Sequence, residues 1–535
     1  MQESKSKMGS RKLQVWLPLL FSLVMVVGIV VGFKLRENTA MPGFFKMSNR
    51  NTFQEVLDLI GMKYVDAVGV DTIGNKSIQS LLRNLDPHSV YIPSSELAMV
   101  NDDLRGNFSG IGVEFQVFHD TVNVLNVLAG GPSDKAGVLV GDKLIRINDS
   151  IQIAGIKLKS EDIRRLLRGS KGTAVKVAIL RDNKPVNITI ERGTIEVPSV
   201  DAAYMINAET GFIHVNKFAE STYREFMKAI EKLKAQKMQK LVLDLRGNGG
   251  GLLGQAVNIA DEFLSEDKLI TYTEGAHVPK YEYRCKREGL FEKGSLVVMV
   301  DESSASASEV LSGALQDWDR ATIVGRRSFG KGLVQEQFSL SDGSALRLTV
   351  ARYYTPLGRN IQKPYKEGYD KYEEEVTNRF HNGEVLKGDT TKKSGPSYKT
   401  DKGRIVYGGG GITPDVFVSF DTTSMGKETV KLFLKGTLSN YIYTYYVKNK
   451  STLINYKKAT ELGEGFTAGN NEWEALKQFA AKDTIDLNKA SAKDKADIIK
   501  RIPALVARQM WRQEGYYQVM NRNDDFVRKA LEVLQ

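Results

Sequence analysis

A serine-rich segment contains the first residues whose type and position could do chemistry. The serines form the string SSASASE at residues 303–309, which follows a predicted strand at Leu296–Val300 and opens a predicted helix. A serine at a helix start is well placed for nucleophilic attack, because the free N–H groups there can stabilise an oxyanion. The same position also suits a helix cap, since Ser306 and Glu309 have the spacing of a capping box.

A serine nucleophile needs a general base, and Lys331 is the candidate. No histidine lies near the serines in sequence, whereas Lys331 follows the next predicted strand, Ala321–Val324, within the string FGKG. A neutral lysine can accept a proton if burial lowers its pKa toward neutrality, and Phe329 offers an apolar neighbour. These residue types indicate a Ser–Lys dyad, which is a known variant of the catalytic triad.

Two other chemistries fit parts of the same region. A GxGxxG string at residues 249–254 follows a strand predicted at Leu241–Leu245, and Glu274 lies 20 residues further on, which is the spacing of a dinucleotide fingerprint. Three consecutive glycines also make a plain turn between strand and helix. The string SFGK at residues 328–331 has the SxxK form of penicillin-binding enzymes, although glycines flank its lysine and no SDN or KTG string is present.

A stretch of about 90 residues ahead of these segments alternates with the period of β-strands. Its strings SGIGV (109–113), GGPSDKAG (130–137) and GDKLIRIN (141–148) resemble a PDZ domain. That resemblance implies peptide binding by strand addition beside the predicted strand Val113–Phe118, with loop N–H groups receiving a terminal carboxylate. The residues implied in binding the substrate C-terminus are Gly110, Ile111, Gly112 and Val113.

The elements around these motifs predict a multidomain fold of α/β and β class. The helical pattern that begins near residue 78 stops at Asp86, because Pro87 disfavours helix there, so His88 is interpreted as a turn residue. Residues 366–405 are polar and are predicted to be an irregular insertion. The further predicted elements are helices at 52–64, 252–264 and 303–318, a hairpin at 338–350, a strand at 412–420 and a helical region from about 427, in which Pro503 suits the first turn of a helix.

The N-terminus predicts a membrane anchor. Leu13 to Phe33 is a 21-residue run without a charge, which is long enough to cross a bilayer as a helix. The sequence after it is a poor cleavage site, which favours an uncleaved signal anchor. Four basic residues precede the run and two follow it, so the N-terminus is expected in the cytoplasm and the remainder in the periplasm or cell exterior.

Composition excludes several classes of function. The 535 residues carry a net charge of +11 without a basic stripe interleaved with aromatic residues, which argues against nucleic-acid binding. The single cysteine, Cys285, excludes an internal disulfide and a cysteine-rich zinc site, and the five histidines lie far apart. We therefore expect no metal and no cofactor.

Several strings together resemble the C-terminal processing (tail-specific) proteases. They are LDPHSVY (85–91), DLRGNGGG (244–251), SSASASE (303–309), GALQD (313–317), FGKGLVQ (329–335), TPLGRNIQ (355–362) and GITPD (411–415), and they cover residues 50 to 420. The resemblance implies that Ser306 is the nucleophile, Lys331 the general base and Gln335 the residue that orients the lysine. It also implies an oxyanion hole made by the backbone N–H groups of Ala307 and of Gly249 or Gly250.

The resulting prediction is a membrane-anchored serine endopeptidase of the bacterial inner membrane that recognises free C-termini and is a possible homo-oligomer. The alternative is a catalytically inactive, membrane-tethered PDZ scaffold or chaperone, against which the intact Ser306, Lys331 and Gln335 argue. The expected division is a cytoplasmic tail (1–12), a transmembrane anchor (13–33), a helical region (34–98), a PDZ domain (99–195), a protease core (196–425) with the polar insertion, and a helical C-terminal region (426–535).

Overall fold

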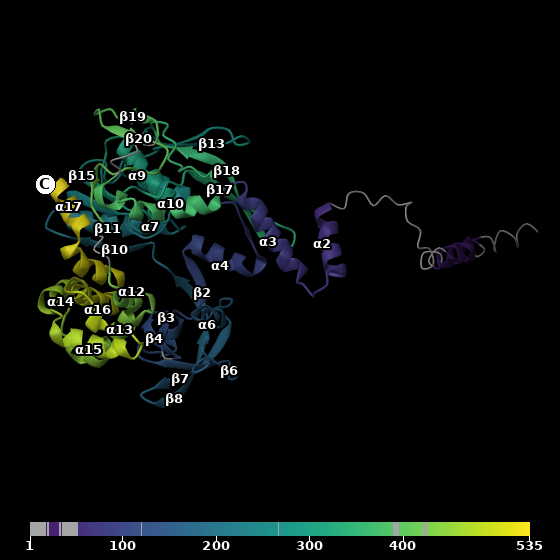
Figure 1. Ribbon diagram of the computed structural model, residues 1–535, viewed down its shortest axis with the longest axis horizontal. Coiled ribbons are helices and arrows are strands. Elements are labelled where there is room, and N and C mark those ends of the chain that lie inside the picture. The colour runs from purple at the N-terminus through teal and green to yellow at the C-terminus, as the bar shows by residue number, and fades with distance from the viewer. Residues whose placement is uncertain are drawn as a thin grey trace, which may run out of the picture. The chain divides into compact units, whose positions relative to one another are not determined.

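The computed structural model describes residues 18, 21–31, 34, 52–118, 120–265, 267–388, 395–420 and 425–535. They divide into two units, residues 1–76 and residues 77–535 (Figure 1). No helix within the described ranges is long and apolar enough to cross a bilayer. The predicted tail at 1–12 lies outside the described residues, as does part of the predicted anchor at 13–33.

In the first unit, α2 (Thr52–Lys63) forms where the capping-box pattern predicts a helix, with Leu57 buried. The next helix, α3 (Val70–Arg83), starts in this unit and ends in the second. It begins about eight residues earlier than predicted. Gly74 is a weak helix former, so it hides the first turns of the helix from a sequence-based prediction. A Cβ added at Gly74 would lie 3.7 Å from the Leu57 side chain.

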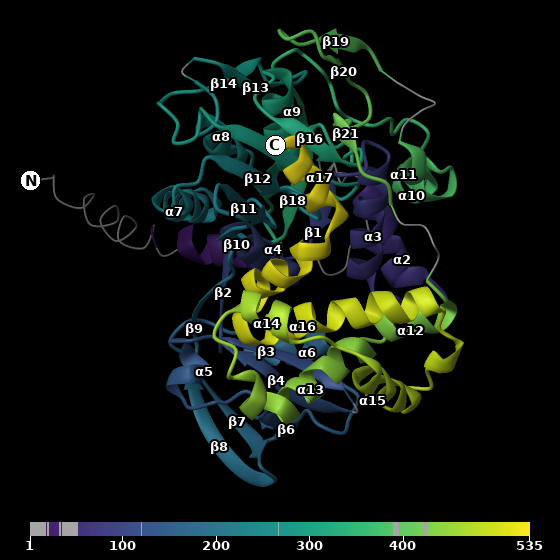
Figure 2. The ribbon, with the colours of Figure 1, turned by 90° about the vertical axis from the view of Figure 1, so that its left-hand side faces the viewer.

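The α/β part of the chain is built on a six-stranded sheet in the order β10-β11-β12-β15-β16-β21, with β10 antiparallel to β11 and the other neighbours parallel. Alternation along β12 divides its side chains between two hydrophobic layers: Leu241 and Leu243 face α7, α8 and α9, whereas Val242 faces α17 (Figure 2). The strands are β10 (Val200–Met205), β11 (Thr210–Val215), β12 (Lys240–Asp244), β15 (Ser295–Val300), β16 (Thr322–Gly325) and β21 (Val416–Phe417); the helices are α7 (Thr222–Ala235), α8 (Leu253–Asp261), α9 (Ala307–Asp317) and α17 (Asp525–Val533).

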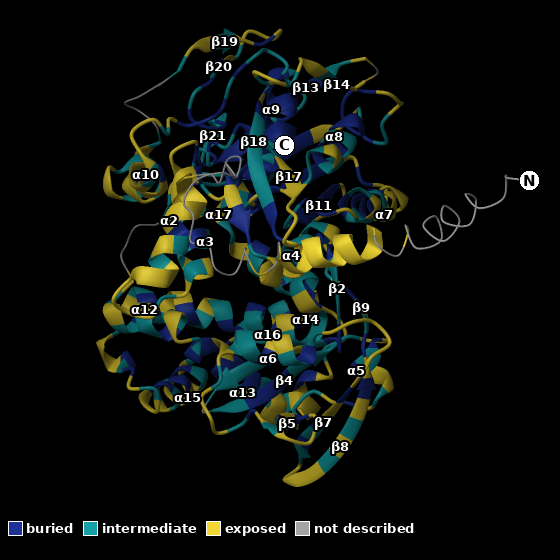
Figure 3. Cartoon of the chain, turned by 90° about the vertical axis from the view of Figure 1, so that its right-hand side faces the viewer, coloured by how far each residue is buried: buried dark blue, intermediate teal, exposed yellow. Residues whose placement is uncertain are grey.

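The inner strands of this sheet carry apolar side chains on both faces, as parallel strands that are covered on two sides require. The predicted strands at 241–245, 296–300 and 321–324 are confirmed, whereas the predicted strand at 412–420 shortens to the two residues of β21. Every residue of α9 is buried, including its polar ones (Figure 3). The helix that starts at the serine string therefore runs through the centre of the core.

A second sheet has the order β1-β18-β13-β14, with β17 also paired to β18. Its long hairpin turns at residues 341–344, where the sequence predicts a turn, and its first strand begins two residues after Lys331. The sheet thereby fixes the direction in which the chain leaves the lysine. The strands are β1 (Val90–Ile92), β13 (Leu269–Glu274), β14 (Tyr281–Arg284), β17 (Leu333–Ser339) and β18 (Ala345–Tyr354).

The PDZ-like module is a separate β-sheet with its own core. The sheet order is β3-β4-β5-β7-β8, with β6 paired to β5, and a two-stranded ribbon of β2 and β9 joins the module to the part built on the six-stranded sheet. The elements are α4 (Ser94–Arg105), β2 (Asn107–Gly110), β3 (Val113–Phe118), β4 (Thr121–Val127), α5 (Pro132–Lys135), β5 (Lys143–Ile147), β6 (Ile151–Gln152), α6 (Ser160–Leu167), β7 (Ala174–Arg181), β8 (Lys184–Glu191) and β9 (Gly193–Glu196).

The polar insertion is not irregular, and this prediction is wrong. It contains α10 (Tyr369–His381), α11 (Glu384–Lys387) and a ribbon of β19 (Ser397–Lys399) and β20 (Ile405–Tyr407). The buried residues of α10 are Tyr372 and Arg379. A pattern search for apolar periodicity misses such a helix, because one of its two buried residues is charged.

The C-terminal region is helical, as predicted, and has its own hydrophobic cluster. Pro503 lies within α16 rather than in its first turn, because Ser491 caps the helix twelve residues earlier by accepting a hydrogen bond from Asp494 N–H. Trp511 and Arg512 have non-helical dihedral angles, so the last part of α16 turns back toward the protease sheet. The elements are α12 (Lys427–Leu434), α13 (Thr437–Leu453), α14 (Ala459–Gly465), α15 (Asn470–Ala481), η1 (Leu487–Lys489), α16 (Ala492–Met520) and η2 (Asn521–Asn523).

Candidate active site

The three alternating serines at the start of α9 have different environments. Ser304 and Ser308 are completely buried, and their hydroxyls donate to the carbonyl oxygens of Leu245 (2.8 Å) and Asn248 (2.9 Å). Ser306 is partly exposed, and its hydroxyl makes no capping hydrogen bond with the helix. Of the three, only Ser306 therefore has a hydroxyl that is accessible and free to react.

The backbone at Ser306 is held in an unusual conformation. Its φ is +55° and its ψ −113°, a combination that non-glycine residues rarely adopt and that persists only when the surroundings enforce it. Gly250 supplies one such constraint: a Cβ added there would lie 2.6 Å from the Ala305 carbonyl oxygen and 2.8 Å from the Ser306 Cβ. The glycine turn therefore packs directly against the nucleophile segment.

The GxGxxG string belongs to this site and not to a dinucleotide loop. Gly251 lies so close to Phe218 that a Cβ would stand 2.2 Å from the Phe218 carbonyl oxygen. Glu274 lies on β13 in the second, antiparallel sheet and does not end a parallel strand beside β12. The dinucleotide interpretation is therefore wrong for two reasons: the glycines pack against Phe218 and the serine segment, and Glu274 lies in the other sheet.

The Glu309 carboxylate joins the serine segment to the lysine segment. Glu309 Oε2 accepts hydrogen bonds from the backbone N–H groups of Ser306 and Lys331, each at 2.8 Å. Its Oε1 accepts from Gly330 N–H at 2.7 Å and from the Ser328 hydroxyl at 2.5 Å. Burial raises the pKa of Glu309, and these four donors oppose that effect. The sequence pattern accounts for only one of the four bonds.

Tyr353 makes a second connection between the same two segments. Its hydroxyl lies 3.1 Å from the Ser306 carbonyl oxygen and also contacts the Lys331 carbonyl oxygen. Because Ser306 and Lys331 share both a carboxylate oxygen and a phenol oxygen as neighbours, the fold brings together the two residues that lie 25 positions apart in the chain. Tyr353 was not identified from the sequence.

Lys331 has the electrostatic environment that a lysine base needs. Burial, followed by the positive charge of Arg347, lowers the pKa of Lys331 to about 8, while Glu309 and Asp86 act in the opposite direction. The segment that carries it is not helical, and the Ser328 hydroxyl is buried and bonded to Glu309. The geometry of a penicillin-binding SxxK helix is therefore absent from residues 326–332.

Gln335 follows Lys331 on β17, at a bulge between Val334 and Gln335 in the pairing with β18. Its side-chain Nε2 is buried, and the described residues provide it with no hydrogen-bond partner. A buried unpaired amide is costly, so it marks a place where a group is expected to bind or to move. The role predicted for Gln335 from the sequence is the orientation of Lys331.

Two of the three N–H groups predicted for the oxyanion hole are free. Within the described ranges, no hydrogen-bond acceptor is present for the N–H of Ala307, the first residue of α9, or for that of Gly249. The Gly250 N–H already donates to Asn248 Oδ1 at 2.8 Å. Gly250 is therefore not a free donor, and of the two glycines Gly249 remains.

The turn at residues 86–89 also reaches this site, which the sequence alone did not indicate. Asp86 accepts from the N–H groups of His88 and Ser89, and the His88 ring lies 2.7 Å from the Tyr372 hydroxyl. Burial and the charge of Lys331 lower the pKa of His88 to about 3, so the ring is neutral. His88 is a turn residue, as predicted, but it lies within electrostatic reach of Lys331.

The PDZ-like module has the features that strand addition requires. β3 is the terminal strand of its sheet and pairs with β4 alone among the described strands. The carbonyls of Ile111 and Gly112 accept from Ser133 and Leu128, and no acceptor within the described ranges takes the Ile111 or Gly112 N–H. Gly112 has φ +75°, which favours glycine at the turn into β3.

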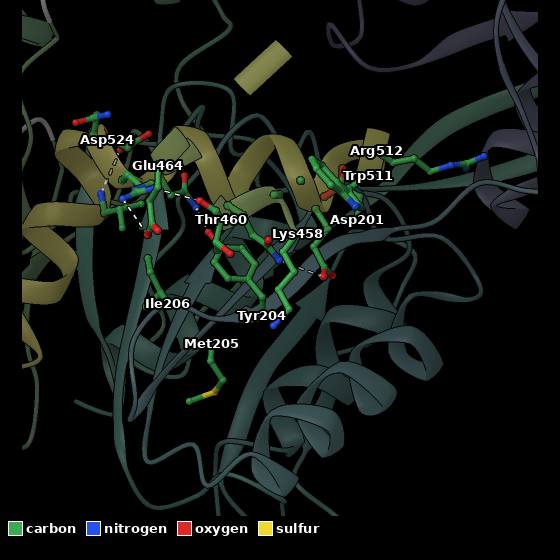
Figure 4. Close-up of a pocket in the computed structure, with 18 of the residues that line it drawn as sticks. Asp201, Tyr204, Met205, Ile206, Lys458, Thr460, Glu464, Trp511, Arg512 and Asp524 are labelled. Carbon is green, nitrogen blue, oxygen red and sulfur yellow. Dashed lines mark hydrogen bonds and ion pairs between the residues drawn. The ribbon is translucent and has the colours of Figure 1, made fainter. Parts of the chain in front are cut away.

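A cavity of about 1440 Å³ lies away from these residues, between β10 and the C-terminal helices. Figure 4 shows Tyr204, Met205 and Ile206 on one side and Trp511 and Arg512, at the break in α16, on another. Neither Ser306 nor Lys331 lines it. Across the described residues, no group of three or more His, Cys, Asp or Glu side chains is arranged to hold a metal ion.

Comparison with known proteins gives matches over most of the chain. The model of peptidase family S41 matches residues 209–368, the PDZ domain model residues 109–191, and a family of unknown function residues 429–512. A carboxy-terminal-processing protease of Bartonella bacilliformis is 35% identical over 316 residues, which cover 58% of this chain and 72% of that protein.

A probable CtpA-like serine protease of Staphylococcus epidermidis is 32% identical over 59% of this chain and 63% of its own length, less than two thirds of it. The solved photosystem II D1 C-terminal processing protease is 25% identical, covers 69% of this chain and 92% of its own, and has a TM-score of 0.36. By its relationship to the Bartonella protein and its match to the family model, this chain belongs to peptidase family S41, the C-terminal processing serine proteases, and carries a PDZ domain.

Proposed function

We propose that this peptidase cuts internal peptide bonds through a Ser306–Lys331 dyad with an acyl-enzyme intermediate. The observation that carries the proposal is the pair of shared contacts, Glu309 and Tyr353, which hold the two residues together. The neutral Lys331 amine takes the proton of the Ser306 hydroxyl as the oxygen attacks the substrate carbonyl carbon. The protonated lysine then gives that proton to the leaving amine as the C–N bond breaks.

Deacylation repeats the same proton transfers with water. Lys331 takes a proton from the water that attacks the ester carbon, and it returns one to the Ser306 oxygen. In both steps the negative oxygen of the tetrahedral intermediate is stabilised by the N–H groups of Ala307 and Gly249. Gln335 orients the Lys331 amine through its side-chain amide. The support for this role is that the amide nitrogen is buried and has no other hydrogen-bond partner among the described residues.

The PDZ domain is proposed to select substrates by their free C-terminus. Support comes from the open edge of β3 and the free N–H groups of Ile111 and Gly112. Val113 and Phe115 are partly buried against the core of the module and offer an apolar setting beside that edge. A tail that ends in an apolar residue fits this groove best.

Amidating the C-terminus of a good peptide substrate should slow its cleavage, because the amide removes the charge and one acceptor that the loop N–H groups bind. The measurement is kcat/KM for matched free-acid and amide peptides on the full chain. Equal rates for the two peptides would exclude recognition of the tail.

Deleting residues 99–195 separates two roles of the PDZ domain. If it only tethers the tail, short peptides are still cut at high concentration, because tethering raises effective concentration alone. If binding also aligns the site, no concentration restores cutting.

The chain is further proposed to be anchored in the bacterial inner membrane by residues 13–33, with the peptidase in the periplasm or outside the cell. The uncharged run and the excess of basic residues before it support this arrangement. Full-length protein should stay in the membrane pellet after alkaline carbonate extraction, and protein lacking residues 1–36 should not. Complete release of the full chain by carbonate would contradict an integral anchor.

A further inference from the structure

Helix α10 packs against the segment that carries Lys331, although it lies outside the peptidase family match. That match ends at residue 368, and α10 begins at Tyr369. Its two buried side chains, Tyr372 and Arg379, both point into the protease core, where they contact residues around the lysine. A helix outside the matched range therefore contacts the segment that carries the proposed base.

Arg379 hydrogen-bonds to the backbone of residues 327–329, shortly before Lys331 in the chain. Its guanidinium is 2% exposed, and it donates to three consecutive carbonyl oxygens. Nη1 donates to Arg327 O (3.0 Å) and Ser328 O (2.8 Å), and Nη2 donates to Phe329 O (3.1 Å). A planar guanidinium offers five donors in a fixed array, which lets one side chain hold three peptide groups.

The opposite side of the same segment is held by Glu309. Its carboxylate accepts the N–H groups of Gly330 and Lys331, while Arg379 takes the carbonyls of residues 327–329. Glycines flank Lys331 on both sides, and Gly330 has φ +93°. Glycine loses the most conformational freedom on ordering, so this segment depends on outside contacts to hold one conformation.

The charge of Arg379 is balanced within α10 itself. Glu375 accepts from Arg379 Nε (2.9 Å) and Nη2 (2.8 Å), and it also pairs with Lys363 (3.2 Å) and Arg327 (3.0 Å). Buried charges with this number of partners are costly to break and fix the geometry of the groups they join. The helix and the lysine segment are therefore joined by a connected network of ion pairs and hydrogen bonds.

Tyr372 extends this network to the turn at residue 88. Its hydroxyl lies 2.7 Å from His88 Nε2, and its ring packs edge-on against Phe329 at 5.9 Å. The Lys363 ammonium lies over both rings and donates to the Tyr372 carbonyl at 3.0 Å. Helix α10 thus contacts both the segment before Lys331 and the turn at His88.

We propose that α10 is a positioning element for Lys331 and that Arg379 is the positioning residue, which sets the lysine by holding the carbonyls of residues 327–329. This role rests on the proposed function of Lys331 as general base. Loss of these hydrogen bonds would let the glycine-flanked segment relax, move the amine away from the Ser306 hydroxyl and expose it to water.

The test compares Arg379→Lys, Arg379→Ala and the control Lys371→Ala in the full chain. Lys371 lies on the same helix, and its one ion-pair partner among the described residues is the solvent-exposed Glu367; the two side chains are 69% and 73% exposed. Arg379→Lys keeps the charge, but one ammonium cannot reach three carbonyls. We expect kcat/KM of Arg379→Lys to fall about 100-fold, because a displacement of about 1 Å costs that much, with Lys371→Ala unchanged.

Two readouts separate positioning from general destabilisation. The acid limb of the pH–kcat/KM profile should move to higher pH in both Arg379 variants, because a more hydrated lysine has a higher pKa. Added guanidinium ion should restore part of the activity of Arg379→Ala and none of that of Lys331→Ala. Thermal unfolding of each variant shows whether it is folded.

Wild-type kcat/KM and an unmoved pH profile in folded Arg379→Lys would overturn the proposal, as would unfolding of both Arg379 variants, since the arginine would then be needed for the fold alone. Loss of activity without guanidinium rescue or a pH shift would also overturn it. Failure of the proposed function looks different, because Lys331→Arg would then be active whatever the Arg379 variants do.

Discussion

Replacing Ser306 by alanine should abolish peptide hydrolysis while leaving the fold intact. Formation of the acyl-enzyme requires the Ser306 hydroxyl, and no other described residue shares its place at the start of α9 beside the glycine turn. Losing a catalytic nucleophile costs about 10⁴-fold or more in kcat. The measurement is steady-state cleavage of a peptide substrate, together with covalent labelling of wild type and variant by a serine-reactive phosphonate.

The neighbouring serines provide matched controls. Ser303→Ala should have wild-type activity, because Ser303 is exposed and its hydroxyl has no hydrogen-bond partner in the part of the chain that the structure describes; its backbone N–H donates to Asp301. Ser308→Ala should lose about 0.5–1.5 kcal/mol of unfolding free energy, because it removes one buried hydrogen bond while the Asn248 carbonyl keeps the Ala305 N–H as a donor. Ser304→Ala should lose about 1–3 kcal/mol, because it also leaves the Asp301 N–H without its acceptor. A fully active Ser306→Ala beside a dead Ser304→Ala or Ser308→Ala would show that the nucleophile is a different serine.

Lys331→Arg should be as inactive as Lys331→Ala. Arginine keeps the positive charge and most of the length, but its pKa lies above 12, so it cannot accept the Ser306 proton at a usable pH. General-base catalysis contributes about 10²- to 10⁴-fold, which sets the size of the loss. The comparison is kcat of the two variants with the same peptide, and substantial activity in the arginine variant would remove Lys331 from the role of base.

The wild-type pH profile tests the same residue without a substitution. Lys331 acts in its neutral form, and its pKa is lowered to about 8, mainly by burial. Below that pH the neutral fraction falls about tenfold per unit, so kcat/KM should decline with that slope on the acidic side. A profile that stays flat down to about pH 6 would be incompatible with a lysine base.

The sequence predicts the central sheet well, for a physical reason. Strands such as β12 and β15 are apolar throughout because both faces are buried, and this pattern is visible without a structure. Ser306 and Lys331 lie in the segments that follow β15 and β16, and Gly250 packs so closely against the Ser306 segment that no side chain fits there. At the strands and at the glycine turn, the residue types that the local pattern shows are the ones that the packing of the folded chain requires.

The contacts that join the pair were not predictable in the same way. Glu309 has the spacing of a helix-cap residue, yet three of its four hydrogen bonds go to residues 328–331, which only the folded chain brings near. Helix α10 was missed because its buried side chains include Arg379, and a buried charge leaves no apolar period. Residue types alone do not show that a charged side chain is buried when its hydrogen-bond partners come from distant parts of the chain.

The position of α17 bears on when proteolytic activity can arise during synthesis. Val527 and Ala530 cover one face of the central sheet, and Asp524 pairs with Arg246 at 2.9 Å, at the end of the strand that leads into the glycine turn. The strands from β10 to β16 are made about 200 residues or more before this helix, and such distant contacts form late. A ribosome-bound chain therefore has an exposed sheet face and an unfinished glycine turn, and it gains a complete active site only after residues 524–533 have emerged.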